Sequence, residues 1–127
     1  MYLTEWDQEK LWIFVIAKLA EERKAKGMKL NYPEAVAVIT FKITEEARTG
    51  KYTVSDLQRM GHNILTEDDV MEGVPKLLTL INIQVTMPDG NKLIVVHNPF
   101  KPAQHPEYGE LPPGWGSRKP AEENDSV

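Results

Sequence analysis

The chain has 127 residues, of which 41% are hydrophobic and 27% charged, so it fits a single globular domain with a modest core. Its net charge of -4 argues against nucleic acid as the main partner, because phosphate binding needs a basic face. The sequence contains no cysteine, which excludes disulfides, thiolate metal sites and a cysteine nucleophile.

The beginning of the sequence does not resemble an export signal. Residues 1–7 are acidic and mixed, whereas a secretory signal would be basic and then apolar. The longest apolar stretch, residues 11–17, is far shorter than the roughly 20 residues that span a bilayer. We therefore expect a soluble, cytoplasmic protein that does not contact a membrane.

The first helix is predicted over about residues 5–26. Thr4 followed by Asp7 resembles a capping box, with an acid in place of the usual Glu or Gln. Gly27 offers a cap for the other end of the helix. Between them, apolar residues recur near helical spacing at Leu11, Phe14, Val15, Leu19 and Ala20.

A second helix is predicted from Asn31 to Gly50. Asn31 can accept hydrogen bonds from free amides, Pro33 is tolerated in a first turn, and Glu34 can reach back to the cap. The apolar residues that follow lie on more than one side of the helix. This distribution predicts a central position in the fold.

Two shorter helices are predicted over residues 53–61 and 66–73. Each begins with a threonine that is followed three residues later by an aspartate, and each ends at a glycine. The residues concerned are Thr53, Asp56 and Gly61 in the third helix, and Thr66, Asp69 and Gly73, with Pro75 behind it, in the fourth.

After the fourth helix the apolar pattern changes to strict alternation. Two alternating stretches flank Pro88-Asp89-Gly90-Asn91, and an Asp-Gly pair is a strong signal for a β-hairpin. The alternating residues are Ile83, Val85 and Met87 before the turn and Leu93, Val95 and His97 after it. The predicted fold class is therefore α+β, a four-helix body followed by a C-terminal antiparallel β-hairpin.

The predicted hairpin carries apolar residues on both of its faces. Ile81, Ile83 and Val85 lie on one side, and Leu80, Leu93 and Val95 lie on the other. One face can pack on the helices, but the second needs another copy or a different chain, since exposed apolar strands invite pairing. The second apolar face therefore predicts that the chain is a subunit of a larger assembly.

Six of the nine prolines fall within residues 98–127, a segment that has few aliphatic residues. Such a composition cannot build a core. We therefore predict a domain over residues 1–100 and an extended or disordered Pro-rich tail over residues 101–127.

The most acidic cluster consists of Glu67, Asp68, Asp69 and Glu72. It could hold a hard cation or supply an acid–base pair. Its spacing instead matches a helix N-terminus, where acids cap the free amides and complement the dipole. A calcium-binding loop with its glycine is absent from the sequence, so the capping interpretation is favoured.

The histidines are His62, His97 and His105. His62 falls at a predicted helix end, where the dipole stabilises an imidazolium. A metal site built from His97, His105 and Glu107 would lack any recognised ligand spacing. These residues, with the acids from Glu67 to Glu72, define an alternative hypothesis of an independent small metallohydrolase.

Other candidate residues favour packing over chemistry. The basic run over residues 23–29 could bind an anionic surface but is more typical of a solvated helix end. Trp6, Trp12 and Phe14 are interpreted as core or interface anchors. Ser55, Ser117 and Ser126 have no histidine beside them in the sequence, and no nucleophile motif or phosphate-binding glycine loop is present. We predict no catalytic, cofactor-binding or metal-binding residue.

Five motifs follow one another along the chain: residues 29–36 (KLNYPEAV), 65–75 (LTEDDVMEGVP), 83–85 (IQV), 88–90 (PDG) and 96–99 (VHNP). Together and in this order they resemble the urease gamma subunit family. The resemblance covers about residues 1–100. Asn98 and Phe100 are mild departures from it, and the tail over residues 101–127 is the larger one, because a free gamma chain usually ends near residue 100.

The resemblance implies a nickel-dependent urea amidohydrolase assembled from alpha, beta and gamma chains, as (alpha-beta-gamma)3 or a higher multiple. It places two nickel ions and every catalytic residue in the alpha subunit, and it implies a structural role for the gamma chain. No site residue therefore carries over to this sequence. A free-standing assembly or regulatory module that reuses the gamma fold is the alternative that the unusual tail leaves open.

Overall fold

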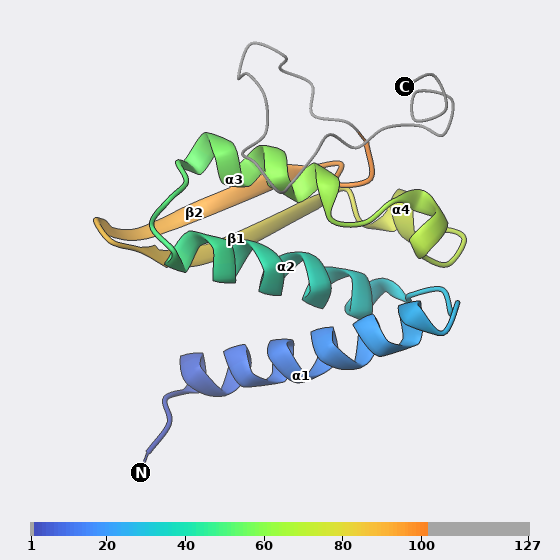
Figure 1. Ribbon diagram of the computed structural model, residues 1–127, viewed down its shortest axis with the longest axis horizontal. Coiled ribbons are helices and arrows are strands. Elements are labelled where there is room, and N and C mark those ends of the chain that lie inside the picture. The colour runs from blue at the N-terminus through green and yellow to red at the C-terminus, as the bar shows by residue number, and fades with distance from the viewer. Residues whose placement is uncertain (1, 102–127) are drawn as a thin grey trace.

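The computed structural model describes residues 2–101, and within this range four α-helices precede a two-stranded antiparallel sheet (Figure 1). The predicted α+β fold class is confirmed. The tail beyond residue 101 lies outside the described residues, and the domain boundary at residue 100 stays a prediction. The helices are α1 (Glu5–Ala25), α2 (Tyr32–Arg48), α3 (Val54–Met60) and α4 (Val74–Leu77), and the strands are β1 (Leu80–Met87) and β2 (Gly90–His97).

The first three helices begin at the predicted capping boxes. In each case the cap side chain accepts a hydrogen bond from the backbone N–H three residues later, and the acid at that position accepts one from the cap's own N–H. The first of these bonds measures 3.1 Å from Asp7 N to Thr4 Oγ1, 2.9 Å from Glu34 N to Asn31 Oδ1 and 3.1 Å from Asp56 N to Thr53 Oγ1.

The fourth helix begins later than predicted. The Thr66–Asp69 box does form, with Thr66 N donating to Asp69 Oδ2 at 2.8 Å, but it opens only a 3-10 turn over Glu67–Asp69. Gly73, which was expected to end the helix, precedes α4 with a φ of 91°. Pro75 lies in the first turn of α4, where its missing N–H costs nothing.

The displacement of this helix has a tertiary cause. Leu30, in the connection between α1 and α2, forms a parallel bridge with Val70. Leu30 N donates to Asp69 O at 3.0 Å, and Met71 N donates to Leu30 O at 2.8 Å. These bonds hold Val70 in an extended conformation, so the backbone leaves its helical path after a single turn.

Helix α2 occupies the centre of the described fold, as its apolar distribution predicted. It packs against α1 on one side and against β1 on the other, while α3 packs against β2 (Figure 1). Its buried apolar residues are Ala35, Ala37, Val38, Ile39, Ile43 and Ala47.

The hairpin turns its inner face toward the helices. Ile83 lies opposite Ile94, and Ile81 lies opposite Val96, and all four side chains are buried. The intervening residues of β1 are exposed, which is the alternation expected of a sheet that is covered on one side.

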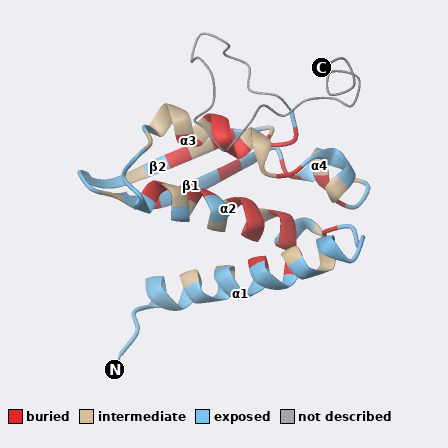
Figure 2. Cartoon of the chain, viewed as in Figure 1, coloured by how far each residue is buried: buried red, intermediate tan, exposed pale blue. Residues whose placement is uncertain are grey.

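Helix α1 forms the outer layer, and most of its surface is exposed (Figure 2). Only Ala17 and Ala20 of this helix are buried. Of the apolar residues whose spacing predicted the helix, Leu11, Val15 and Leu19 face solvent. Within residues 2–101, no helix combines the length and apolar character that crossing a membrane requires.

Gly61 provides a close contact between α3 and β2. Its φ of -56° suits any residue, but a Cβ there would lie 2.6 Å from Val96 Cγ2. We expect Gly61→Ala to lower the free energy of unfolding by about 1–3 kcal/mol through overpacking, measured by urea denaturation. In a Val96→Ala background the same change should lower the free energy of unfolding clearly less. An equal loss in both backgrounds would contradict overpacking against Val96.

Ile83 tests the packing of the hairpin on the helices. Because its side chain is fully buried opposite Ile94, Ile83→Asp would bury an unpaired charge. We expect a loss of about 3–5 kcal/mol in the free energy of unfolding. Gln84→Asp, on the exposed face of the same strand, is the matched control and should change it little. Equal stability of the two variants would remove this packing interpretation.

Candidate interaction surface

Helix α1 presents an apolar stripe on the side turned away from α2. A helix advances about 100° per residue, so Leu11, Val15 and Leu19 lie roughly opposite the buried Ala17 and Ala20, whereas Trp12 and Ile16 extend the stripe toward the flank of the helix. The small alanines let α1 approach α2 closely, which leaves the large apolar residues outside. This α1 stripe consists of Leu11, Trp12, Val15, Ile16 and Leu19, which are 48%, 64%, 59%, 38% and 43% exposed.

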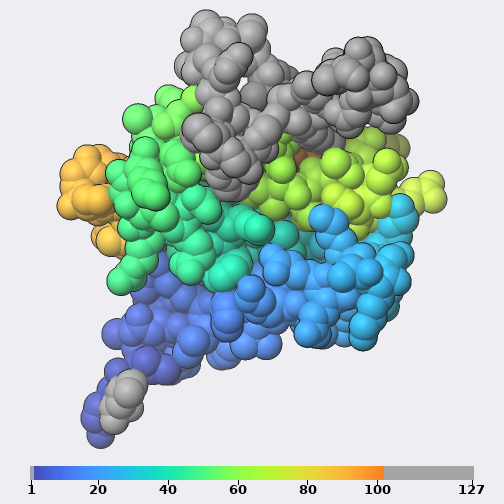
Figure 3. Space-filling model, viewed as in Figure 1, coloured from blue at the N-terminus to red at the C-terminus, as the bar shows by residue number. Residues whose placement is uncertain are grey.

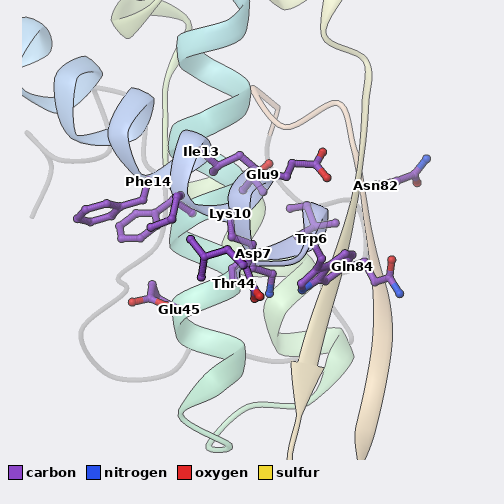
Figure 4. A pocket seen from close by; sticks show the side chains of 15 residues that line it. Trp6, Asp7, Glu9, Lys10, Ile13, Phe14, Thr44, Glu45, Asn82 and Gln84 are labelled. Atoms are coloured by element: carbon purple, nitrogen blue, oxygen red, sulfur yellow. The ribbon is translucent and has the colours of Figure 1, made fainter. Parts of the chain in front are cut away.

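A groove of about 750 Å³ lies between the N-terminal half of α1, the middle of α2 and β1 (Figure 4). Phe14 and Phe41 meet there with ring centroids 5.2 Å apart at an angle of 55°. Trp6 and Ile83 contribute further apolar surface to this α1 groove. Acidic residues line it as well, namely Asp7, Glu9 and Glu45.

Two lysines lie over the aromatic rings of this region. Lys10 Nζ lies 4.8 Å from the ring centre of Trp6. Lys18 Nζ lies 5.8 Å from the ring centre of Phe14 and 5.6 Å from that of Phe41. Cations in such positions are attracted to the ring faces and cover part of the apolar surface. The aromatic walls of the groove therefore remain accessible in part, and charged side chains lie at its edges.

The outer hairpin face is apolar at one end only. Leu80 and Leu93 are exposed there, and Val95 is half-buried. Asn82 and Gln84 of β1 occupy the same face and make it more polar than the sequence suggested. The prediction that one apolar face packs on the helices is confirmed for the described residues, whereas a partner on the other face stays a prediction.

A partly buried ion pair, in which the carboxylate is buried and the guanidinium is exposed on one side, joins the end of α1 to the start of α2. Arg23 Nη1 lies 2.6 Å from Glu34 Oε2, and Asn31 N donates to Glu34 Oε1 at 2.9 Å. Burial of the carboxyl group alone would raise the pKa of Glu34. The hydrogen bond from Asn31 and the guanidinium of Arg23 outweigh burial and lower this pKa from its ordinary value of 4.5.

The acidic cluster serves local structure, as the capping interpretation predicted. Asp69 completes the box with Thr66 and lies 3.8 Å from Lys24 Nζ. The backbone carbonyl of Asp68 accepts a hydrogen bond from Lys29 Nζ. The basic run over residues 23–29 is thus tied at Arg23, Lys24 and Lys29 to other parts of the same chain.

The candidate histidines lie in different places in the described chain. His62 is in the 3-10 turn Gly61–Asn63, and its Nδ1 lies 2.6 Å from Lys101 O. His97 ends β2, opposite Leu80, and is exposed. His105 and Glu107, and with them the proposed three-residue metal site, lie outside the described residues. Within residues 2–101, no group of three or more His, Asp or Glu side chains could hold a metal ion.

The remaining candidates also have defined positions. Ser55 lies in α3, whereas Ser117 and Ser126 are outside the described residues. The aromatic residues of α1 are not core: Trp6 lines the groove, Phe14 contacts Phe41, and Trp12 belongs to the α1 stripe. Sequence reasoning missed the stripe and the groove. The available signal was the presence of apolar residues on every side of the first helix.

A comparison with protein-family models gives a match to a known family. The family described as "Urease, gamma subunit" matches residues 1–100, which include all the helices and strands described above.

The Arg23–Glu34 pair predicts a dependence of stability on pH. Because the folded state lowers the pKa of Glu34, the pair stabilises above pH 4.5, and this contribution is lost as the pH falls through the lowered pKa. We expect Glu34→Gln to destabilise the protein at neutral pH and to differ progressively less from the unaltered chain below about pH 4.5. Urea denaturation at several pH values measures this difference. Glu45→Gln, exposed on the same helix, is the control, and a constant Glu34→Gln difference would contradict the assignment.

Proposed function

The chain belongs to the urease gamma subunit family, and from this premise we propose that it is a non-catalytic structural subunit of a urease complex. Membership makes it a subunit of urease, a hydrolase complex, and implies association with other urease subunits. The observation that carries the proposal is the length of the match. Residues 1–100 comprise every described helix and strand, so the family fold accounts for the whole described body.

The finer composition of the complex is part of the same proposal. We assign the hydrolysis of urea to ammonia and carbamate to a partner alpha subunit that holds two nickel ions. The complex contains alpha, beta and gamma chains, as (alpha-beta-gamma)3 or a higher multiple, in the cytoplasm. We propose that this chain contributes structure to the complex and no residue to the reacting atoms.

The exposed apolar surface supports a role in assembly. Monomeric proteins rarely leave large apolar side chains exposed in contiguous groups. Here such groups occur in the α1 stripe, around the α1 groove and at one end of the outer hairpin face. We assign the groove and the outer hairpin face to the alpha and beta subunits, because both surfaces lie along the sheet.

Co-expression with urease alpha and beta chains tests the proposal. We expect the three chains to purify together in a fixed ratio, with nickel present only when the alpha chain is present. A chain that ignores both partners would favour a free-standing regulatory or assembly module. Stoichiometric metal and hydrolysis by the isolated chain would favour the independent metallohydrolase instead.

Leu93 tests the outer hairpin face within this complex. Its side chain is 55% exposed, so Leu93→Asp should leave the free energy of unfolding nearly unchanged. We expect the same variant to weaken assembly at least about tenfold, because a charge would be desolvated in the interface. Pull-down with the alpha and beta chains measures this effect. Leu77→Asp, an exposed apolar position in α4, is the matched control, and equal assembly of the two variants would exclude the hairpin face from the interface.

A further inference from the structure

One stretch of the tail differs in charge from the sequence around it. Residues 111–119 (LPPGWGSRK) contain Arg118 and Lys119 and no acid. Acids begin again on both sides of this stretch, at Glu110 and at Glu122, and they set its limits. The tail segment 111–119 is therefore the basic part of an otherwise acidic tail.

The α1 groove carries the opposite charge. Asp7, Glu9 and Glu45 line it, against the single lysine Lys10, whose ammonium group lies over the ring of Trp6. Within residues 2–101, none of these three carboxylates lies within 4.0 Å of a basic side-chain nitrogen. Asp7 caps α1, whereas Glu9 and Glu45 are exposed to solvent. The groove is therefore suited to a basic occupant.

The walls of the groove match the apolar part of the tail segment. Trp6 and Phe14 are 40% and 41% exposed, and Phe14 contacts Phe41 of α2. Aromatic grooves bind proline-rich segments, because flat rings pack against pyrrolidine rings and a polyproline II segment loses little conformational entropy on binding. Residues 112–113 are both proline, and Trp115 follows them.

The tail is long enough to bring this segment to the groove. Lys101, the last described residue, lies beside the end of α3, with its carbonyl oxygen 2.6 Å from His62 Nδ1. The 13 residues of 102–114 can span roughly 40 Å, whereas a body of about 100 residues has a radius of gyration of only about 13 Å. Helices α3 and α1 lie on opposite sides of α2 (Figure 3). A chain of this length can pass from one to the other.

We propose that residues 111–119 occupy the α1 groove of their own chain. Trp115 packs on the aromatic walls, and the two cations of the segment lie toward Glu9 and Glu45. A short tether gives an effective concentration on the order of millimolar, so a contact too weak to hold a separate peptide still fills the groove of the same chain. A segment from another chain lacks this advantage.

The docked segment covers a surface that the proposed function gives to partner subunits. In this one respect the inference rests on the proposed function, since the alpha and beta chains must displace the segment before they contact the groove. Only the fraction of chains with an open groove binds, so the segment lowers the apparent affinity for these partners. It acts as an internal competitor that shields the aromatic walls before assembly.

Paired cysteines test the docking in the full chain, which contains no cysteine of its own. Thr44→Cys with Ser117→Cys joins the groove to the segment. Ser55→Cys with Ser117→Cys is the matched control, because Ser55 is also a half-buried hydroxyl residue and lies on α3, outside the groove. We expect the disulfide within one chain to form at least about tenfold faster in the first pair.

Mass spectrometry after mild oxidation of dilute protein measures both rates, and circular dichroism establishes that the variants are folded. Equal rates would overturn the docking. Disulfides that form only between chains would also reject it, because the groove would then take the tail of a second copy.

Changes within the tail identify the groups that hold it. Trp115→Ala, and Arg118→Gln together with Lys119→Gln, should each lower the ratio of the two rates at least about threefold. Both pairs contain position 117, so altered reactivity of that thiol cancels in the ratio. Tyr108→Ala, which removes an aromatic side chain outside the segment, should leave the ratio unchanged. An unchanged ratio in Trp115→Ala, or an equal loss in Tyr108→Ala, would refute the assigned contact.

Oxidation before assembly tests the competition with the partners. The oxidised chain with Thr44→Cys and Ser117→Cys should not co-purify with the alpha and beta chains, and reduction should restore binding. The control with Ser55→Cys and Ser117→Cys should co-purify in both states. Binding of the oxidised first variant would exclude the competition. If the unaltered chain binds neither partner while the first disulfide still forms faster, the proposed function is wrong and the docking stands.

Discussion

The burial of α2 between α1 and β1 is the constraint on which the rest of the structure depends. Every turn of this helix contributes at least one small or β-branched residue to the core, and the helix has no exposed apolar row of its own beyond its first turn. Alanines on α1 and α2 let the helices approach closely. The hairpin then closes the opposite side with Ile81, Ile83 and Val85. Helix α1, helix α2 and the hairpin are thus the three layers of the core.

Helix α1 covers α2 with a narrow inner face, since only Ala17 and Ala20 of this helix are buried. Its larger apolar residues remain exposed to solvent, and contact between so much apolar surface and water is unfavourable. The Arg23–Glu34 pair fixes the end of α1 against the start of α2. The exposed residues are therefore held on a rigid element, which suits an interface better than a mobile loop would. The arrangement is that of a component whose surface is completed by other chains.

Polar contacts in the described chain also hold its elements in place. The acids that resembled a cation site cap a turn, and the basic run binds back to that turn and to α2. Together they attach the connection between α1 and α2 to the segment before α4, where Leu30 pairs with Val70. These charges set the positions of the elements relative to one another.

The sequence by itself determined the features that arise from local interactions. Capping boxes depend on residues three apart, and the hairpin turn depends on adjacent residues, so the starts of α1, α2 and α3 and the position of the turn were predictable. The family motifs were likewise visible, and the family match over residues 1–100 agrees with them. Tertiary structure alone decided which side of α1 faces inward, because apolar residues surround that helix and its period cannot choose between them. It also moved the fourth helix past Gly73, since the Leu30–Val70 bridge joins segments 40 residues apart in the sequence and overrides the local cap.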